Sequence, residues 1–325
     1  TALGAFRDPR AVGPLVCLLR DADRAVRQAA IGALAAIGES SVPVLGLCLA
    51  DPQAGVQEAA SSVLAMIADE RVLDPLIAAL ANQDWIVRMH AAKALGRIRD
   101  ARAIEPLLPL LQDKVKAVRE EAATALADLG ECAVASLVGA LKHSEWLVRL
   151  HAVEALGRSR SADAVEPLLR VLFNDPDQAV REDAVRALGQ LGDGRAVEFL
   201  VTVMKEPGLR TLAVEALGRI GDRRALPVLM AVVEGGDRPA SRAVAGCGDS
   251  WDEEMNTKGA AVRALGGLGD DAAIPALLKA LNETVTRADA ATALVRFGTK
   301  VVAPLVTIMT QTADENLRFH AKDAL

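Results

Sequence analysis

A helical pattern of hydrophobic positions recurs along the chain, and it is clearest in Trp85–Asp100, WIVRMHAAKALGRIRD. Apolar or small residues fall there at steps of i, i+4, i+7, i+8 and i+11, which form one stripe of a helix with 3.6 residues per turn. These residues are Val87, Ala91, Ala94, Leu95 and Ile98. Closely similar segments begin at Trp146, Ala179 and Leu209, so the pattern predicts a helix that is repeated many times.

The alanine of the ALG-like triplet marks the register of the repeats. The spacing between successive marks is about 31 residues, except for one longer step from Ala216 to Ala264. A period of this size is typical of stacked supersecondary units, and about ten units fit in the chain. The marks are Ala2, Ala33, Val63, Ala94, Ala125, Ala155, Ala187, Ala216, Ala264, Ala293 and Ala324.

Each unit is expected to contain two helices. The first opens near a proline, such as Pro43 or Pro106, because a first helical turn tolerates the missing N–H. The second opens with an acidic residue, which caps free N–H groups, and a basic residue follows four positions later. We expect this helix to end at a glycine that permits the turn into the next unit. These glycines include Gly96, Gly157, Gly189 and Gly218.

The pattern DxxVRxxAxxALGxIGDxRAVxPLL, best seen from Asp177 to Leu200, resembles the HEAT-like repeats of the phycobilisome-lyase type. The resemblance implies an all-α, right-handed solenoid of about ten two-helix repeats. It also implies that the second helices line a concave side, which is usually the binding side. We expect residues 1–325 to form one continuous domain, and a fragment of a longer chain, since neither end reads as a capping repeat.

Composition narrows the class of protein. A hydrophobic content of 51% with only 2% aromatic residues suits thin, closely packed helices. The net charge of −6 argues against an overall nucleic-acid-binding surface. Four cysteines without a CxxC pair fit a reducing compartment, so we expect a cytoplasmic protein without a structural zinc site. No uninterrupted apolar run reaches about 18 residues, and we predict no transmembrane span.

The basic residues of the second helices form a regular series that invites a phosphate-binding interpretation. Since an acid precedes most of them by four residues, we favour a ladder of ion pairs on and between repeats. The series is Arg27, Arg88, Arg119, Arg149, Arg181, Arg210, Lys258, Arg287 and Arg318.

Three histidines, His90, His151 and His320, share one repeat position, two residues after the ladder base. Similar repeats of deoxyhypusine hydroxylase carry His-Glu pairs that bind two irons. Here alanine follows each histidine, the histidine sits one place later, and no carboxylate partner is evident. We therefore expect hydrogen-bonding spacers between units, and no metal site or cofactor.

Two second helices are predicted to expose large apolar side chains on the face opposite the core stripe. One group is Trp85, Ile86 and Met89, and its counterpart two units later is Trp146, Leu147 and Leu150. At about 10 Å per helix the two groups lie roughly 20 Å apart. Exposed tryptophan beside aliphatic residues is typical of interface anchors, although each ring could instead fold over its helix start and fill a gap. The charged residues expected around the groups are Lys93, Lys116, Glu120, Glu154 and Arg186.

The longer step lies within the eighth unit and predicts an insertion at residues 235–251, between helices at about Ala225–Val233 and from near Glu254. Insertions in solenoids form loops that are often functional. We expect either a tolerated excursion or a contribution to partner binding, with a reactive Cys247 as a third alternative. The candidate residues are Arg238, Arg242, Cys247 and Trp251.

Together these patterns predict a non-enzymatic scaffold that binds a partner helix, loop or peptide on its concave face. An alternative is a bilin lyase-like or chaperone-like protein that handles an apolar tetrapyrrole. A second alternative is nucleic-acid binding, which glutamates on the same face oppose. Those glutamates are Glu58, Glu120, Glu154, Glu182 and Glu215.

Overall fold

The computed structural model describes residues 7–67, 70–235 and 249–325, apart from the side chains of 70–71, 207 and 249–252. Within these residues every regular element is an α-helix or a 3₁₀ helix. The chain divides into two compact units, Thr1–Ala164 and Val165–Leu325. Each unit is a run of stacked two-helix repeats, and the predicted all-α repeat architecture is confirmed.

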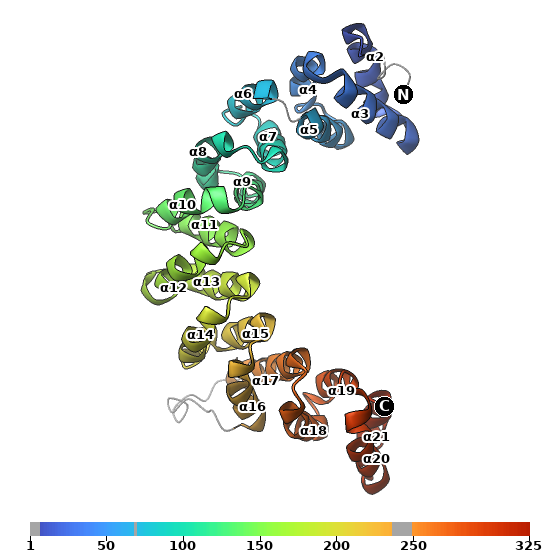
Figure 1. Cartoon of the computed structure of the whole chain (residues 1–325), viewed down its shortest axis with the longest axis vertical. Helices are drawn as coiled ribbons and strands as arrows, with labels where there is room; N and C mark the ends of the chain where they lie inside the picture. The colour runs from blue at the N-terminus through green and yellow to red at the C-terminus, as the bar shows by residue number, and fades with distance from the viewer. Residues whose placement is uncertain (1–6, 68–69, 236–248) are drawn as a thin grey trace. The chain divides into compact units, whose positions relative to one another are not determined.

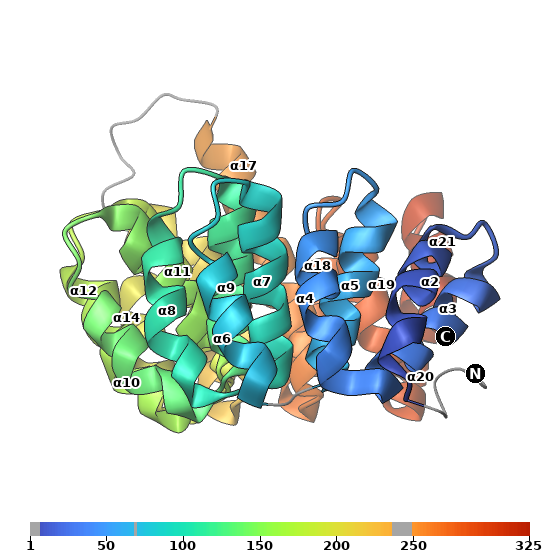
Figure 2. The same ribbon diagram turned by 90° about the horizontal axis from the view of Figure 1, so that it is seen from above.

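In the first unit, first and second helices alternate along the chain. Figure 1 shows α4, α6, α8 and α10 in one row and α5, α7, α9 and α11 in another, and Figure 2 shows the same helices from a direction turned by 90°. The first helices are α2 (Val12–Cys17), α4 (Val42–Cys48), α6 (Glu70–Ala79), α8 (Ile104–Leu107) with η5 (Leu108–Gln112), and α10 (Glu131–Ala140). The second helices are α3 (Arg24–Ile37), α5 (Ala54–Ile67), α7 (Trp85–Ile98), α9 (Lys116–Asp128) and α11 (Trp146–Arg158).

The second unit repeats this organisation. Its first helices are α12 (Val165–Asn174), α14 (Val197–Val203), α16 (Leu226–Glu234), α18 (Ile274–Asn282) and α20 (Val302–Gln311). Its second helices are α13 (Gln178–Leu191), α15 (Arg210–Ile220), α17 (Asp249–Leu268), α19 (Arg287–Val295) and α21 (Glu315–Asp323). Helix α17 begins five residues before the expected Glu254. Acids in its first turns, such as Glu253 and Glu254, favour this longer start through the helix dipole.

The core consists of Leu, Val and Ala side chains from the predicted stripe. In α7, Val87, Ala91, Ala94 and Leu95 are buried, whereas Ile98 is only partly covered. The largest fully buried side chains are leucines, such as Leu95 and Leu126. Small residues let neighbouring helices approach closely, and this explains how a core nearly without aromatic rings can be dense.

The predicted role of the ALG glycines is wrong. Helix α7 continues past Gly96 to Ile98, and the left-handed cap is Arg99, with φ of 60°. Helices α13 and α15 likewise continue past Gly189 and Gly218 and end at Gly192 and Gly221. The glycines inside the helices instead make room for the next repeat. A Cβ on Gly96 would lie 2.7 Å from the Cα of Ala125.

Asp-x-Arg turns start many of the first helices. The Asp100 carboxylate accepts a hydrogen bond from the Arg102 N–H at 2.9 Å, and the Arg102 guanidinium bonds back to the same carboxylate. Asp222 and Arg224 repeat this geometry, and the side-chain hydrogen bond from Arg224 lowers the pKa of Asp222 to about 2. The caps are local, so the sequence alone can specify where each first helix begins.

One stretch, Arg24–Cys48, is long and apolar enough to cross a membrane by length and composition alone. In the fold it comprises three elements, α3, η3 (Gly38–Ser41) and α4. The chain changes direction at Gly38, where φ is 75°, and Ala33 and Leu34 are buried in the repeat core. Core helices of a repeat therefore account for its apolar composition.

Candidate protein-binding surface

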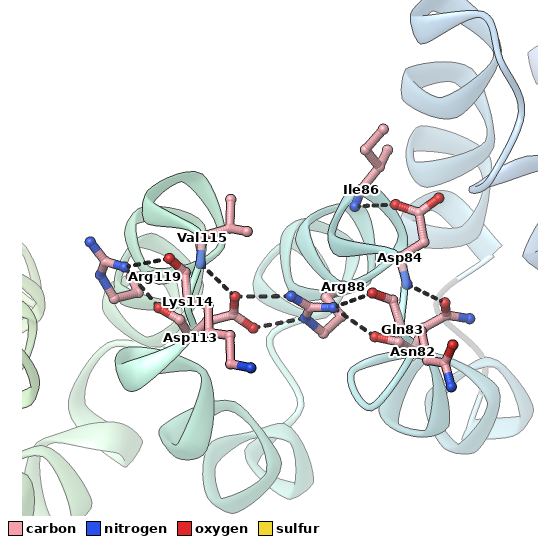
Figure 3. Close-up of polar contacts among 9 residues, drawn as sticks. All are labelled: Asn82, Gln83, Asp84, Ile86, Arg88, Asp113, Lys114, Val115 and Arg119. Carbon is pink, nitrogen blue, oxygen red and sulfur yellow. Dashed lines mark hydrogen bonds and ion pairs between the residues drawn. The ribbon is translucent and has the colours of Figure 1, made fainter.

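The ladder base of α7, Arg88, connects its own repeat to the next one. Arg88 donates through Nη1 to the backbone carbonyls of Asn82 and Gln83, at 2.7 and 3.0 Å, and so holds the loop between the two helices of its own repeat. Its Nε and Nη2 donate to both carboxylate oxygens of Asp113 in the next repeat, at 2.7 and 2.9 Å. Figure 3 shows Arg88 between the two repeats, with Arg119 in the equivalent position one repeat later.

Other repeats reproduce both halves of this arrangement. Arg119, Arg149 and Arg287 donate to carbonyls five and six residues earlier in the chain. Ion pairs to the following repeat are Arg88–Asp113, Arg181–Glu206, Lys258–Glu283 and Arg287–Asp314. The predicted ion pairs between repeats are thus confirmed at these four ladder positions.

The acid four residues before the ladder base does not pair with it in α7. Asp84 instead accepts a hydrogen bond from the Ile86 N–H at 2.9 Å and caps the helix. Asp23, Asp177 and Asp314 cap their helices in the same way. The capping prediction is thus confirmed. The expected ion pair between Asp84 and Arg88 within α7 is replaced by a pair across repeats, because the Arg88 guanidinium turns toward the loops at the helix start.

The structure leaves the two predicted tryptophans on the surface of the first unit. Trp85 and Trp146 are the first residues of α7 and α11, and they are 40% and 41% exposed. The first turns of each helix also carry two half-buried aliphatic side chains: Ile86 and Met89 on α7, and Leu147 and Leu150 on α11. We call these groups the α7 cluster (Trp85, Ile86, Met89) and the α11 cluster (Trp146, Leu147, Leu150).

Helix α9, between α7 and α11 in the chain and in contact with both, carries charge at the matching positions. Lys116 pairs with Glu120 one turn later, at 3.2 Å, and both side chains are at least half exposed. On α7, Lys93 pairs with Glu58 of the preceding repeat at 2.6 Å. The polar positions expected around the clusters are therefore engaged in ion pairs that neutralise their charges locally.

His90 and His151 are buried, whereas His320 on α21 is partly exposed. The expected hydrogen-bonding role is found for His151, but the buried Nδ1 of His90 has no hydrogen-bond partner within the described part of the chain. The Arg119 Nε donates to the His151 Nε2 at 3.3 Å, and the His151 Nδ1 lies 3.2 Å from the Glu154 carboxylate. The expectation that no carboxylate accompanies the histidine is thus wrong for His151, because the helix places Glu154 one turn away. Burial disfavours the charged imidazolium and so lowers the pKa of His90. Among the described residues, no three His, Cys, Asp or Glu side chains are grouped to hold a metal ion.

One predicted site residue lies apart from these clusters, and four others cannot be placed from the described residues and side chains. Arg186 lies on α13 in the second unit, where it pairs with Glu182 and Asp183. Arg238, Arg242 and Cys247 lie outside the described residues. Trp251 belongs to α17, and its side chain is also outside the description.

Sequence reasoning missed two features, one on two first helices and one between two second helices. Phe173 of α12 and Phe199 of α14 form an edge-to-face pair with ring centroids 6.1 Å apart, and they are 43% and 42% exposed. The second feature is a cleft between α15 and α17, lined by Glu215, Arg219 and Arg263. Comparing one register position across neighbouring second helices would have signalled the cleft, whereas the two phenylalanines stand at different positions of their first helices.

Comparison with known proteins agrees with the architecture. A family model described as HEAT repeats matches residues 1–64, 42–127, 104–172, 134–207, 165–246 and 250–325. Deoxyhypusine hydroxylase-B of Oryza sativa subsp. japonica is 30% identical over 211 residues, which cover 63% of this chain and 69% of that protein.

Two solved structures are among those similar to this chain. Kap95p, whose binding induces the switch loops of RanGDP to adopt the GTP-bound conformation, superposes with a TM-score of 0.60 and 15% identity, over 99% of this chain and 52% of that one. The complex of CpcE and CpcF of phycocyanin lyase from Nostoc gives a TM-score of 0.39 and 21% identity, over 78% of this chain and 92% of the other. The chain thus spans about half the length of Kap95p.

Proposed function

Because this chain belongs to the HEAT-repeat family, whose model matches it over nearly its whole length, we propose that it is a protein-binding scaffold. The partner would be a helix, loop or peptide held on the second-helix face of the first unit. The observation that carries the proposal is the pair of exposed clusters on α7 and α11, each built around a tryptophan.

The exposed ring area is large enough to matter for binding. A tryptophan side chain has about 250 Å² of surface, so exposures of 40% and 41% leave ~100 Å² per ring. At ~25 cal/mol per Å², covering one ring contributes about 2.5 kcal/mol. Two such anchors, separated by the neutralised Lys116–Glu120 pair, support a partner with two apolar contacts rather than a highly charged one.

The fold relatives support protein binding as a general use of this architecture. Kap95p is a larger solenoid that binds RanGDP, and the likeness to it concerns the fold. By this proposal the second-helix face would be the concave binding face that the resemblance to HEAT-like repeats implies. Localisation in the cytoplasm remains part of the proposal.

An enzymatic role is the second candidate, because the similarity to deoxyhypusine hydroxylase-B is a specific observation in its favour. The residues present do not reproduce consecutive His-Glu pairs: Ala91 follows His90 and Ala152 follows His151. His151 is also engaged at both ring nitrogens. Iron bound stoichiometrically by the purified protein would favour the enzyme. Stoichiometric binding of a tetrapyrrole would favour a lyase-like protein.

The scaffold is tested by replacing Trp85 and Trp146 together with alanine. Partners captured from lysate by the wild type and the variant are compared by mass spectrometry. We expect unchanged helicity, nearly unchanged melting and a strong loss of the partner. The matched control is Phe173→Ala with Phe199→Ala, since that pair is equally exposed and lies on first helices. A large drop in melting temperature for the tryptophan variant would show that the rings are core and would refute the surface.

A further inference from the structure

The α7 and α11 clusters lie on either side of a helix that has no matching apolar group. Helix α9 contacts both α7 and α11. At the position of the two tryptophans it carries Lys116, and at the position of Ile86 and Leu147 it carries the small Ala117. Lys116 pairs with Glu120 at 3.2 Å. A partner that touches both clusters therefore crosses three helices and makes its apolar contacts over the outer two.

The distance between the clusters sets the spacing of the partner's apolar residues. Packed helices lie about 8–10 Å apart, so two clusters that are two helices apart are separated by roughly 16–20 Å. An α-helical ligand rises about 1.5 Å per residue and spans this distance in about 11–13 residues. Eleven residues make about three full turns, so residues i and i+11 of such a ligand point to the same side.

The polar side chains beside the clusters, further along the same helices, already have partners. They form a network of ion pairs and hydrogen bonds that joins α5 to α7 and α9 to α11. The contacts are Lys93–Glu58 at 2.6 Å, Arg97–Ser62 at 2.9 Å, Arg158–Thr124 at 3.0 Å and Arg158–Glu154 at 2.6 Å.

This surface suits a helical ligand better than an extended one. An extended peptide needs partners for its backbone N–H and C=O groups, which a strand edge or polar side chains supply in other complexes. The described part of the chain has no strand, and the side chains of the network are engaged with one another. A helix satisfies its own backbone, so it requires only the side-chain contacts that the clusters offer.

The size of the exposed apolar surface favours a short segment over a second folded copy. The two rings leave about 200 Å² exposed. If the four half-buried aliphatic side chains doubled this area, it would still be about half of the ~800 Å² that each partner buries in a stable interface between folded proteins.

We infer that the first unit binds an amphipathic α-helix of its partner through two pairs of large aliphatic side chains, at i and i+4 and at i+11 and i+15. One pair covers the α7 cluster and the other covers the α11 cluster. The ligand residues between the pairs are small or polar, because they lie over Ala117 and the Lys116–Glu120 ion pair. The inference rests on the proposed protein-binding function and specifies the form of the partner.

The test compares three labelled peptides of about 20 residues, built from alanine, glutamate and lysine with four leucines, by fluorescence anisotropy with the full chain. The matched peptide has leucines at i, i+4, i+11 and i+15. The displaced peptide has its second pair moved by two residues, which turns that pair by about 200° to the opposite side of the helix. The third keeps the matched spacing but has two central prolines, which break the helix.

We expect the displaced and the proline peptides to bind at least about tenfold more weakly than the matched peptide, since each can place only one pair on a cluster. Trp85→Ala and Trp146→Ala should each remove this discrimination, because one cluster loses its anchor. Phe173→Ala is the matched control in the second unit, where a ring that is 43% exposed is removed, and it should leave all three affinities unchanged.

The peptide comparison uses the wild-type chain, so it stays decisive if a tryptophan variant fails to fold. Equal affinities for the matched and displaced peptides, equally tight binding of the proline peptide, or no binding of the matched peptide at about 1 mM would overturn the inference. If capture of the natural partner still depends on the two tryptophans, only the helical form is then refuted. Undiminished capture by the double variant would refute the proposed function and the inference together.

Discussion

Replacing Arg88 with methionine tests the idea that the ladder base joins neighbouring repeats. The substitution keeps the apolar stem and removes four hydrogen bonds, two to Asp113 and two to the carbonyls of Asn82 and Gln83. The Arg88 and Asp113 side chains are only 15% and 11% exposed, so the variant leaves a largely buried carboxylate without its cation. Removing one partner of a buried pair costs about 3–5 kcal/mol.

We expect a loss near the lower limit, about 3 kcal/mol, because some water reaches the pair and the Val115 N–H still donates to Asp113. Repeat proteins can unfold in parts, so hydrogen exchange of α7 and α9 is a better assay than one global melting temperature. A loss of about 3 kcal/mol corresponds to roughly a hundredfold faster exchange. Arg102→Met is the control, since Arg102 is 49% exposed and pairs locally with Asp100.

The Arg102 variant should lose less than about 1 kcal/mol. If Arg88→Met behaves like this control, or if its faster exchange is not confined to the α7–α9 region, the ladder does not hold the repeats together. Low pH gives an internal check. Burial raises the pKa of Asp113, but hydrogen bonds from Arg88 and the Val115 N–H outweigh it and set the pKa below 3.8. The pair's contribution is therefore present above this pH and is lost as pH falls below it, where wild type and variant should converge.

The remaining predictions concern packing and protonation. Gly96→Ala should destabilise by about 1–3 kcal/mol, because its Cβ would lie 2.7 Å from the Ala125 Cα. Gly267→Ala on α17 has only the Arg296 guanidinium within 4.0 Å and should be neutral or stabilising, by up to about 1 kcal/mol in urea unfolding. The pKa of His90 is lowered from 6.5, so the unfolded state binds its proton first and wild-type stability should fall as pH drops below that value. In the His90→Gln variant, the free energy of unfolding should fall less steeply between about pH 7.5 and about pH 5.5 than in the wild type. An equal slope in both proteins would contradict the role given to His90.

The sequence by itself determined the two-helix repeat, because the signals that define it lie within one helix or one turn. The stripe from Val87 to Leu95, the period of about 31 residues and the capping aspartates act within one helix or one turn, and each could be recognised from spacing. The ladder could also be predicted, since a base that recurs at one register position needs a recurrent partner. Exposure of Trp85 and Trp146 followed from their place opposite the stripe.

Only the tertiary structure decided which side chains of neighbouring repeats contact each other. Gly96 reads as a helix terminator in sequence, but it lies inside α7, and the approach of Ala125 shows that it is a contact point between repeats. The carboxylate beside His151 and the cleft between α15 and α17 depend on which side chains face each other across a groove. These facts have one physical cause: a helix sequence fixes the direction of each side chain, whereas the neighbour it meets depends on the stagger of two packed helices.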